Sequence, residues 1–213
     1  PDAAGELKGD LVVSGRGDPS WKTRVSGGAE RRDFWTTFDP FVAVLAKAGV
    51  KKITGDVVAD ATWLHALPNG AGWTADDLND YYGAEISAIT LEENYAELRV
   101  TPGARVGEKC EFALLQPHTG LVLDNRTTTI AKDGKRRIEA VRIIGENVVH
   151  VFGELPVGDK EEIVDVTVPK PANWFAAALK AALERKGIQV EGGARSLRWP
   201  DEPAAGPRAK VEI

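Results

Sequence analysis

The chain has 213 residues, of which 43% are hydrophobic and 28% charged, and its formal net charge is −5. This length fits one ordinary domain or two small ones, and the composition is typical of a globular protein rather than a disordered one. The negative charge gives no indication of a nucleic-acid surface. No apolar run approaches the roughly 20 residues that a membrane-spanning helix needs.

The first residue is proline, and the sequence contains no methionine. We therefore expect the chain to be processed or excised from a longer one, and no signal peptide is recognisable in it. Cys110 is the single cysteine, which excludes an intrachain disulfide. Its neighbours indicate a strand cysteine without chemistry of its own.

The N-terminal part predicts a strand, a helix and a second strand. Residues 5–13 form the first strand, which ends in a run of turn-forming residues. After a polar stretch, Asp39 followed by proline predicts a helix start with Asp39 as the N-cap, and apolar residues at helical spacing continue to residue 48. Gly49 suits the left-handed position that ends a helix. The second strand covers residues 51–60.

The C-terminal part repeats this plan. Pro171 opens an apolar helical stripe, Gly187 ends it, and residues 188–190 continue as a strand. Units of helix followed by strand pack their helices on a sheet. The two units therefore predict one α/β (or α+β) domain with a mixed sheet and two helices, built from both ends of the chain.

The middle of the chain has a different pattern. Residues 88–156 show short alternating runs separated by turn signals and no helix, which predicts an all-β module. We expect a discontinuous α/β domain of residues 1–84 and 160–213, carrying an inserted all-β domain of residues 85–159. The Pro-, Ala- and Gly-rich residues 200–207 are typical of a linker.

Serine catalysis by the S-x-x-K pattern requires a lysine one helical turn after the serine. None of the serines has lysine at that spacing, and S-x-N is absent as well. His118-Thr119-Gly120 is similar to K-T-G with histidine in place of lysine, but it has no serine partner. The serines are Ser14, Ser20, Ser26, Ser87 and Ser196.

A metal or cofactor is not expected. The three histidines, His65, His118 and His150, are scattered, and no H-x-x-x-H or C-x-x-C spacing occurs.

One segment, residues 72–84, gathers three acids and three aromatics within a dozen residues. Such a combination can hold an ammonium group through charge and cation–π attraction, and ligand sites favour domain junctions. The same residues are also compatible with a capped turn, in which Thr74 is the N-cap, Asp77 closes a capping box and Trp73 packs as a staple. The residues alone leave both interpretations open.

The order of several markers resembles the low-molecular-mass class C penicillin-binding proteins, the DacB-like D-Ala-D-Ala carboxypeptidase/endopeptidase family S13. The resemblance covers almost the whole chain. The markers are Gly9-Asp10-Leu11-Val12-Val13, Gly17-Asp18-Pro19, Gly49-Val50, Gly55-Asp56-Val57-Val58-Ala59-Asp60, Gly72-Trp73, Asp76-Asp77-Leu78, Tyr82-Gly83-Ala84, Glu93-Asn94, Pro102-Gly103, Gly153-Glu154-Leu155-Pro156, Gly187-Ile188 and Gly192.

The resemblance implies that this chain is the non-catalytic insert of such an enzyme, between the S-x-x-K serine and the S-x-N motif. Its partners would be the transpeptidase-like catalytic domain of the parent chain and a peptidoglycan stem peptide, in the periplasm or another extracytoplasmic bacterial compartment. No catalytic residue would lie on this chain, and the chain alone would be inactive.

The resemblance further implies that one segment of the insert contacts the side chain of the stem peptide. Carried over residue by residue, this role falls first on Asp77 and Tyr82, and then on Asp76, Trp73 and Tyr81. Family members often have an aromatic residue where this chain has alanine at position 75, so that side of the pocket differs.

Two other functions remain to be distinguished from the accessory insert. One is a free-standing module that binds peptidoglycan or a partner protein. The other is an independent hydrolase with Asp76 and Asp77 as its acid/base pair, although adjacent residues seldom face one another across a bond.

Overall fold

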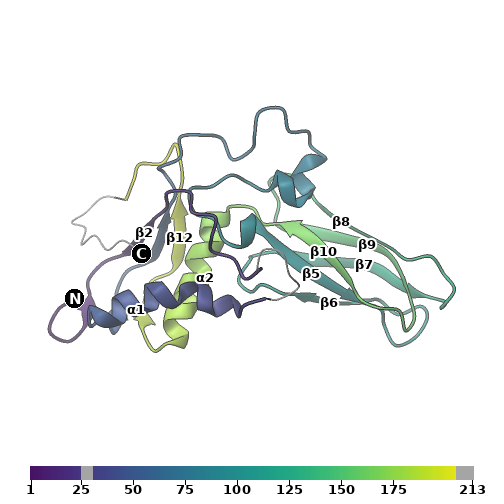
Figure 1. The fold of residues 1–213 in the computed structure, drawn as a ribbon, viewed down its shortest axis with the longest axis horizontal. Coiled ribbons are helices and arrows are strands. Elements are labelled where there is room, and N and C mark those ends of the chain that lie inside the picture. The colour runs from purple at the N-terminus through teal and green to yellow at the C-terminus, as the bar shows by residue number, and fades with distance from the viewer. Residues whose placement is uncertain (25–30, 205–213) are drawn as a thin grey trace. The chain divides into compact units, whose positions relative to one another are not determined.

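The computed structural model describes residues 1–24 and 31–204, which form two compact units (Figure 1). Unit 1 consists of Pro1–Pro68, Ile86–Glu93 and Lys170–Ile213, and unit 2 of Asn69–Glu85 and Asn94–Pro169. Residues 205–207 of the expected linker lie outside the described residues.

In unit 1, three stretches of chain run parallel to one another, and they form two successive three-stranded sheets. The first sheet has the order β1-β3-β11 and the second β2-β4-β12, and every pairing in them is parallel. The strands are β1 (Glu6–Leu7), β2 (Leu11–Ser14), β3 (Lys52–Ile53), β4 (Val57–Asp60), β11 (Gln189–Val190) and β12 (Ala194–Leu197). The expected strands of residues 5–13 and 51–60 are thus each divided in two, whereas the expected strand of residues 188–190 corresponds to β11 alone and β12 was not expected.

The division falls where glycines let the three stretches approach closely. A Cβ on Gly55 would lie 2.5 Å from the carbonyl carbon of Gly9, and one on Gly192 would lie 2.4 Å from that of Gly55. Carboxylates replace part of the missing ladder, because Asp10 Oδ1 accepts from the Asp56 backbone N–H and Asp56 Oδ1 accepts from the Gly193 backbone N–H, each at 2.8 Å. Arg195 in turn donates to Asp10 Oδ2 at 2.8 Å and to Asp56 Oδ2 at 2.9 Å. Between the two sheets the backbones of the three stretches are therefore in close contact, and charged side chains connect neighbouring stretches.

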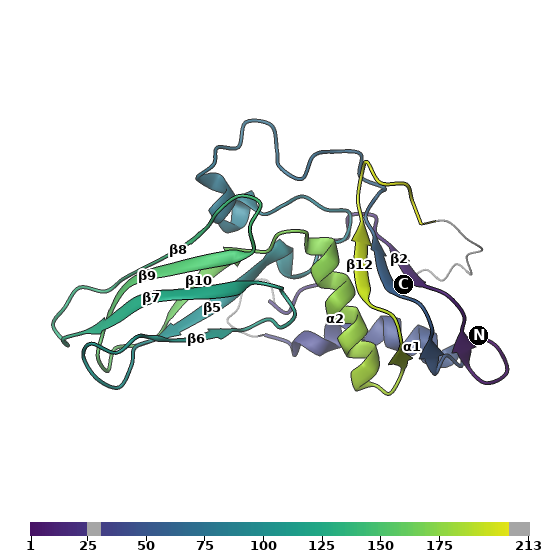
Figure 2. The ribbon, with the colours of Figure 1, turned by 180° about the vertical axis from the view of Figure 1, so that it is seen from behind.

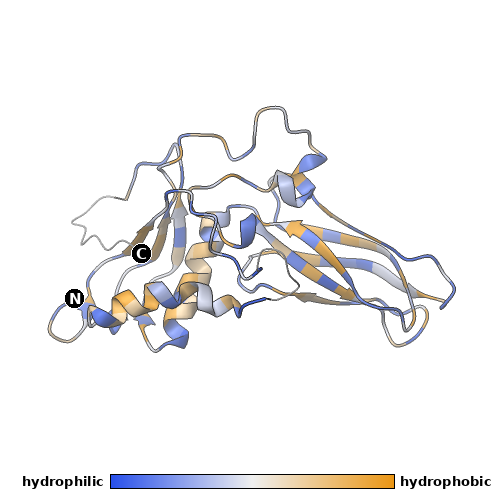
Figure 3. Cartoon of the chain, in the orientation of Figure 1, coloured by the Kyte–Doolittle hydropathy of each residue, from blue (hydrophilic) through white to orange (hydrophobic). Residues whose placement is uncertain are grey.

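The described residues of unit 1 also form two α-helices, α1 (Asp39–Lys47) and α2 (Pro171–Arg185). Figure 2 shows α2 lying along β12 and β4, and Figure 3 shows the apolar stripe of the same helix. Phe175 in α2 is fully buried, and the ring of Trp21 stacks on it at 5.1 Å between centroids. The buried aromatic face of α2 therefore forms the centre of the unit 1 core.

The start of α1 differs from the expectation. The N-cap is Phe38 rather than Asp39, and it makes no side-chain cap bond. A short 3-10 helix, η1 (Phe34–Phe38), leads directly into α1, so Asp39 becomes its first residue. The cap bond occurs earlier, where Asp33 accepts from the Trp35 backbone N–H. Gly49 has φ +76°, as expected for a left-handed helix end.

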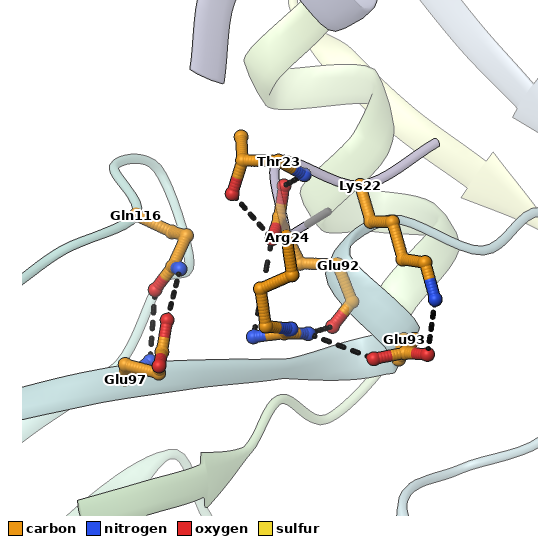
Figure 4. Close-up of polar contacts among 7 residues, drawn as sticks. All are labelled: Lys22, Thr23, Arg24, Glu92, Glu93, Glu97 and Gln116. Carbon is orange, nitrogen blue, oxygen red and sulfur yellow. Dashed lines mark hydrogen bonds and ion pairs between the residues drawn. The ribbon is translucent and has the colours of Figure 1, made fainter. Parts of the chain in front are cut away.

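A polar clasp in unit 1 joins residues 22–24 to Glu92 and Glu93 (Figure 4). The fully buried Glu92 carboxylate accepts from the Thr23 backbone N–H at 2.7 Å and from its hydroxyl at 3.0 Å. Glu93 accepts from Lys22 at 2.8 Å and from Arg24 at 3.2 Å. Both glutamates have positive φ, in η4 (Glu92–Asn94), a conformation that costs about 1–3 kcal/mol per residue. The clasp offsets that cost.

Unit 2 contains two three-stranded sheets and two 3-10 turns. One sheet, β10-β5-β6, is antiparallel, and the other, β7-β9-β8, is mixed because β7 pairs with β9 in parallel and β8 with β9 antiparallel. The elements are η2 (Asp77–Asn79), η3 (Tyr81–Gly83), β5 (Tyr95–Thr101), β6 (Glu111–Leu114), β7 (Val122–Ile130), β8 (Arg137–Arg142), β9 (Val148–Pro156) and β10 (Glu162–Thr167).

Aliphatic residues from both sheets form the core of unit 2, among them Leu98, Val149 and Leu155, all fully buried. Cys110 lies in the same core as a free cysteine. The buried Glu97 carboxylate accepts from the Gln116 amide at 3.0 Å, and Gln116 accepts from the Glu97 backbone N–H (Figure 4). These two bonds give the buried Glu97 carboxylate and the Gln116 amide hydrogen-bond partners.

The expected fold class is confirmed: two α-helices pack with strands in unit 1, and unit 2 has strands without an α-helix. The two compact units assign some segments differently from the expected division. Asn69–Glu85 lies in unit 2 and Ile86–Glu93 in unit 1, while β10 extends the β module beyond residue 159. A division into domains that fold independently stays a prediction.

Candidate functional site

The five residues expected to contact substrate all lie in the segment Asn69–Glu85 of unit 2. Two 3-10 turns, η2 and η3, follow one another there and are separated only by Asp80. Tyr81 and Tyr82 are exposed over more than half of their surface, at 57% and 56%. The segment therefore presents aromatic rings and carboxylates to solvent, which a binding surface requires.

The Asp77 carboxylate is held by a local bond pair. Its Oδ2 accepts from the Thr74 backbone N–H at 2.7 Å and from the Thr74 hydroxyl at 3.0 Å. This is the backward half of a capping box. The forward half, a bond from the Asp77 backbone N–H to the Thr74 hydroxyl, is absent among the described residues, and the N-cap of η2 is Asp76 rather than the expected Thr74. One carboxylate oxygen is thereby fixed in the turn, and Oδ1 makes no hydrogen bond among the residues the structure describes.

Tyr82 is oriented by Asp80. The Tyr82 hydroxyl donates to Asp80 Oδ2 at 2.6 Å, and this bond, with the nearby negative charges of Asp80 and Asp77, raises the pKa of Tyr82 to about 12. Tyr81 packs edge-on against Tyr82 at 5.5 Å and also contacts the buried Tyr95 at 5.8 Å. The Tyr82 hydroxyl donates its proton to the hydrogen bond with Asp80, and the lone pairs of its oxygen remain available to accept from another donor.

The segment is anchored to the sheets of unit 2 by a small network around Arg142. The Arg142 backbone N–H donates to Asn79 Oδ1 at 2.7 Å, and the Thr167 hydroxyl donates to the Leu78 carbonyl at 2.9 Å. The guanidinium of Arg142 donates to the Thr167 carbonyl and hydroxyl. Burial lowers the pKa of Arg142. These bonds fix η2 on β8 and β10.

Gly83 explains why the two turns pack so closely. A Cβ at this position would lie 1.9 Å from the Asp77 carbonyl oxygen, which is far inside van der Waals contact. Only glycine allows η3 to fold back on η2 at this distance. The proximity of Asp77 to Tyr82 therefore depends on Gly83.

The structure brings together Asp77, Tyr81 and Tyr82 of the expected set. Asp76 is exposed, and its side chain makes no hydrogen bond among the described residues, while Trp73 is half-buried beside Gly70. Sequence reasoning missed Asp80 as a partner of Tyr82. Its two-residue separation from Tyr82 across the start of a turn is a signal that the sequence contained.

Other candidates from the sequence do not form a site. Among the described residues, no group of three or more His, Cys, Asp and Glu side chains could hold a metal ion. His150 pairs with Asp124 at 2.8 Å on the face of β7 and β9. His118 has φ +62°, so His118-Thr119-Gly120 forms a turn rather than a strand. No helix in residues 1–24 and 31–204 is long and apolar enough to cross a membrane.

Two solved structures have a fold similar to this chain. One is penicillin binding protein 4 (dacB) from Haemophilus influenzae, with a TM-score of 0.74 and 23% identity over 95% of this chain and 41% of that one. The other is the same protein complexed with a novel β-lactam, with a TM-score of 0.63, 20% identity and coverage of 95% and 39%. The fold is therefore one found within penicillin-binding proteins.

Sequence comparison gives the family. The model of the D-Ala-D-Ala carboxypeptidase 3 (S13) family matches residues 2–205, and the chain belongs to this family. It is 29% identical, over its full length and 39% of the relative, to a D-alanyl-D-alanine carboxypeptidase of Actinomadura sp. (strain R39). It is 32% identical over 44% of its length to DacB of Haemophilus influenzae, matching 18% of that protein. The chain spans about two fifths of the length of the Actinomadura relative.

Proposed function

We propose that this chain is the accessory region of a longer serine-type D-Ala-D-Ala carboxypeptidase/endopeptidase, which acts on peptidoglycan stem peptides in an extracytoplasmic compartment of a bacterium. One observation carries the proposal. The family model matches residues 2–205, yet the sequence contains no S-x-x-K, S-x-N or K-T-G motif. The catalytic machinery of the family is then expected on a transpeptidase-like domain of the same parent chain.

The reaction proposed for the parent takes place on that domain. Its serine hydroxyl attacks the carbonyl of the penultimate D-Ala, the C–N bond breaks, and the terminal D-Ala leaves with the proton on its amine. Water then hydrolyses the ester and restores the serine. A β-lactam would acylate the same serine. No residue of this chain takes part in bond making or breaking.

The role proposed for this chain is to contact the side chain of the stem peptide through residues 73–82. Asp77 Oδ1 and the Tyr82 oxygen are acceptors, and the exposed rings of Tyr81 and Tyr82 can attract a cation. A side-chain ammonium group is the ligand that fits acceptors and aromatic faces without donors. Asp76 and Trp73 would border this surface.

The test is turnover by the longer enzyme. Asp77→Ala is expected to lower kcat/KM for stem peptides that carry a free side-chain amine by about 10- to 100-fold, which corresponds to about 1.4–2.7 kcal/mol. Acylation by a simple β-lactam should change little. Asp77→Asn should behave like Asp77→Ala, because it retains an acceptor but removes the charge.

Thr74→Val is the matched control, because it removes one of the two bonds that hold Asp77 without changing the charge. It should retain most of the amine preference. Equal loss of peptide turnover and β-lactam acylation in Asp77→Ala, or a loss of the same size in Thr74→Val, would contradict substrate contact and favour a structural turn.

The alternative of a free-standing binding module makes a different prediction for the isolated chain. A saturable retention of the purified chain on isolated peptidoglycan sacculi would support that alternative. An accessory region that depends on its catalytic domain should remain in the supernatant.

A further inference from the structure

Unit 1 has a surface groove of about 380 Å³ between η1 and the C-terminal end of α2. This volume is within the range of small-ligand sites, which begins at about 300 Å³. Charged, hydroxyl and indole groups line it together. The lining residues are Asp33, Trp35, Thr36, Asp39, Arg185 and Lys186.

The indole wall of the groove is fixed from behind. Phe34 and Phe38 of η1 are buried, Phe34 stacks on Trp174 at 6.5 Å, and Phe38 lies 5.7 Å from Phe175. Because these two phenylalanines face the core, the intervening part of η1 faces outward. Trp35 is thereby held half-exposed at the mouth of the groove, with its ring edge-on to Phe34 at 5.3 Å.

All four of the charged or hydroxyl side chains that line the groove beside Arg185 already have partners. Asp33 Oδ1 accepts from the Trp35 backbone N–H, and the Thr36 hydroxyl donates to the Asp33 carbonyl at 2.6 Å. Lys186 and Asp39 form an ion pair at 3.2 Å. These contacts brace the two sides of the groove, and the hydroxyl oxygen of Thr36 remains able to accept.

Arg185 is different. Its guanidinium carbon lies 4.4 Å from the centroid of the Trp35 ring, and within the described ranges it has no hydrogen bond or ion pair. A guanidinium stacked on an indole keeps its N–H groups in its own plane, where they are free to donate in a fork. The fork matches the two oxygens of a carboxylate, which Arg binds in bidentate geometry.

We propose that this groove binds the carboxyl end of a peptide, with Arg185 as the carboxylate anchor. The Thr36 oxygen and the second oxygen of Asp33 are the acceptors available for the N–H of the last peptide bond, and the groove wall at Trp35 offers apolar surface to the terminal side chain. This inference concerns unit 1 alone and does not depend on the proposed function.

The test follows the indole N–H signals of the chain by NMR during titration with N-acetyl-alanyl-alanine and with its C-terminal amide. The chain has six tryptophans, and Trp35→Phe assigns the signal of Trp35. The free acid should shift that signal saturably, and the amide should bind at least ten-fold more weakly. Equal affinity for acid and amide, or no saturable shift up to the solubility of the peptide, would overturn the proposal.

Variants identify the anchor. Arg185→Gln should weaken binding of the acid at least ten-fold, and Arg185→Lys should lose part of the affinity because it keeps the charge without the fork. Lys47→Gln is the matched control, since it removes an exposed cation of α1 that does not line the groove. If Arg185→Gln fails to fold, the binding affinity of Arg185→Lys and the comparison of acid with amide test whether Arg185 is the anchor. Undiminished binding in Arg185→Lys, with no preference for the acid, would refute the anchor.

Discussion

Replacing Arg142 by methionine is expected to loosen the attachment of η2 in unit 2, because it removes the guanidinium that positions Thr167 and leaves only the backbone bond to Asn79 in place. Arg142 is 9% exposed and donates from Nε to the Thr167 carbonyl at 3.2 Å, from Nη2 to the Thr167 hydroxyl at 3.0 Å and from Nη1 to the Glu146 carbonyl at 3.1 Å. Each bond to a charged group contributes about 1.5–3 kcal/mol. Burial of the guanidinium offsets part of this. The net loss should be about 2–4 kcal/mol.

The assay is amide hydrogen exchange in β8 and β10, which reports the local free energy of opening in unit 2. A double-mutant cycle with Thr167→Val isolates the pair, and we expect a coupling energy of at least about 1 kcal/mol. Leu155→Ala is a positive control for the core of unit 2, at about 2–5 kcal/mol. A change below about 0.5 kcal/mol in Arg142→Met would refute the network as the anchor of η2.

Two further predictions concern titrating groups. The Gly193 N–H, followed by Arg195, lowers the pKa of Asp56, so the carboxylate stabilises the fold above the unfolded pKa and this stability is lost as the pH falls through the lower folded value. Denaturation midpoints at pH 7 and pH 3 should therefore differ less in Asp56→Asn than in the parent, and an equal difference would contradict the bridge. For Tyr82, Asp80→Asn should bring the phenol pKa from about 12 back toward its ordinary value of 10, as phenolate absorbance would show. An unchanged titration would mean that Asp80 does not orient Tyr82.

Much of unit 1 could be predicted because its signals are local. Pro171 and Gly187 bound α2, and Gly49 ends α1, since proline and a left-handed glycine fix the backbone wherever they occur. The division of the expected strands of residues 5–13 and 51–60 was not predictable in this way. It depends on Gly55 and Gly192 meeting across the sheet, and a single stretch of sequence does not show such a meeting.

The 3-10 helix η1 shows a second limit. Its Phe34 and Phe38 are four residues apart, which is helical spacing. Two apolar residues among polar neighbours are too few to be recognised as the apolar face of a helix. Packing against Trp174 and Phe175 decides the conformation there, and those residues lie some 140 positions away along the chain. Strand β10 was not expected for the same reason, because its partner β5 lies at the other end of the β module in the sequence.

For the candidate site, the sequence singles out the segment as a hypothesis but does not show the bonds within it. Thr74 and Asp77 were expected to form a capping box with Thr74 as the N-cap, but the N-cap of η2 is Asp76. Of the two capping-box bonds, only the one from the Thr74 backbone N–H to the Asp77 carboxylate is present among the described residues. The two-residue separation of Asp80 and Tyr82 makes their pairing possible, but the pairing also requires the chain direction at the start of η3, which depends on the close approach of Gly83 to Asp77. Backbone contacts of this kind have no residue pattern.

The proposal that this chain is the accessory region of a serine carboxypeptidase is tested most directly on the natural gene product. The protein, isolated from its source, would be treated with benzylpenicillin and analysed by intact-mass and peptide mass spectrometry. We predict a polypeptide longer than 213 residues, acylated on one serine that lies outside this sequence. A natural product of this length alone, or an acylated serine within it, would contradict the account.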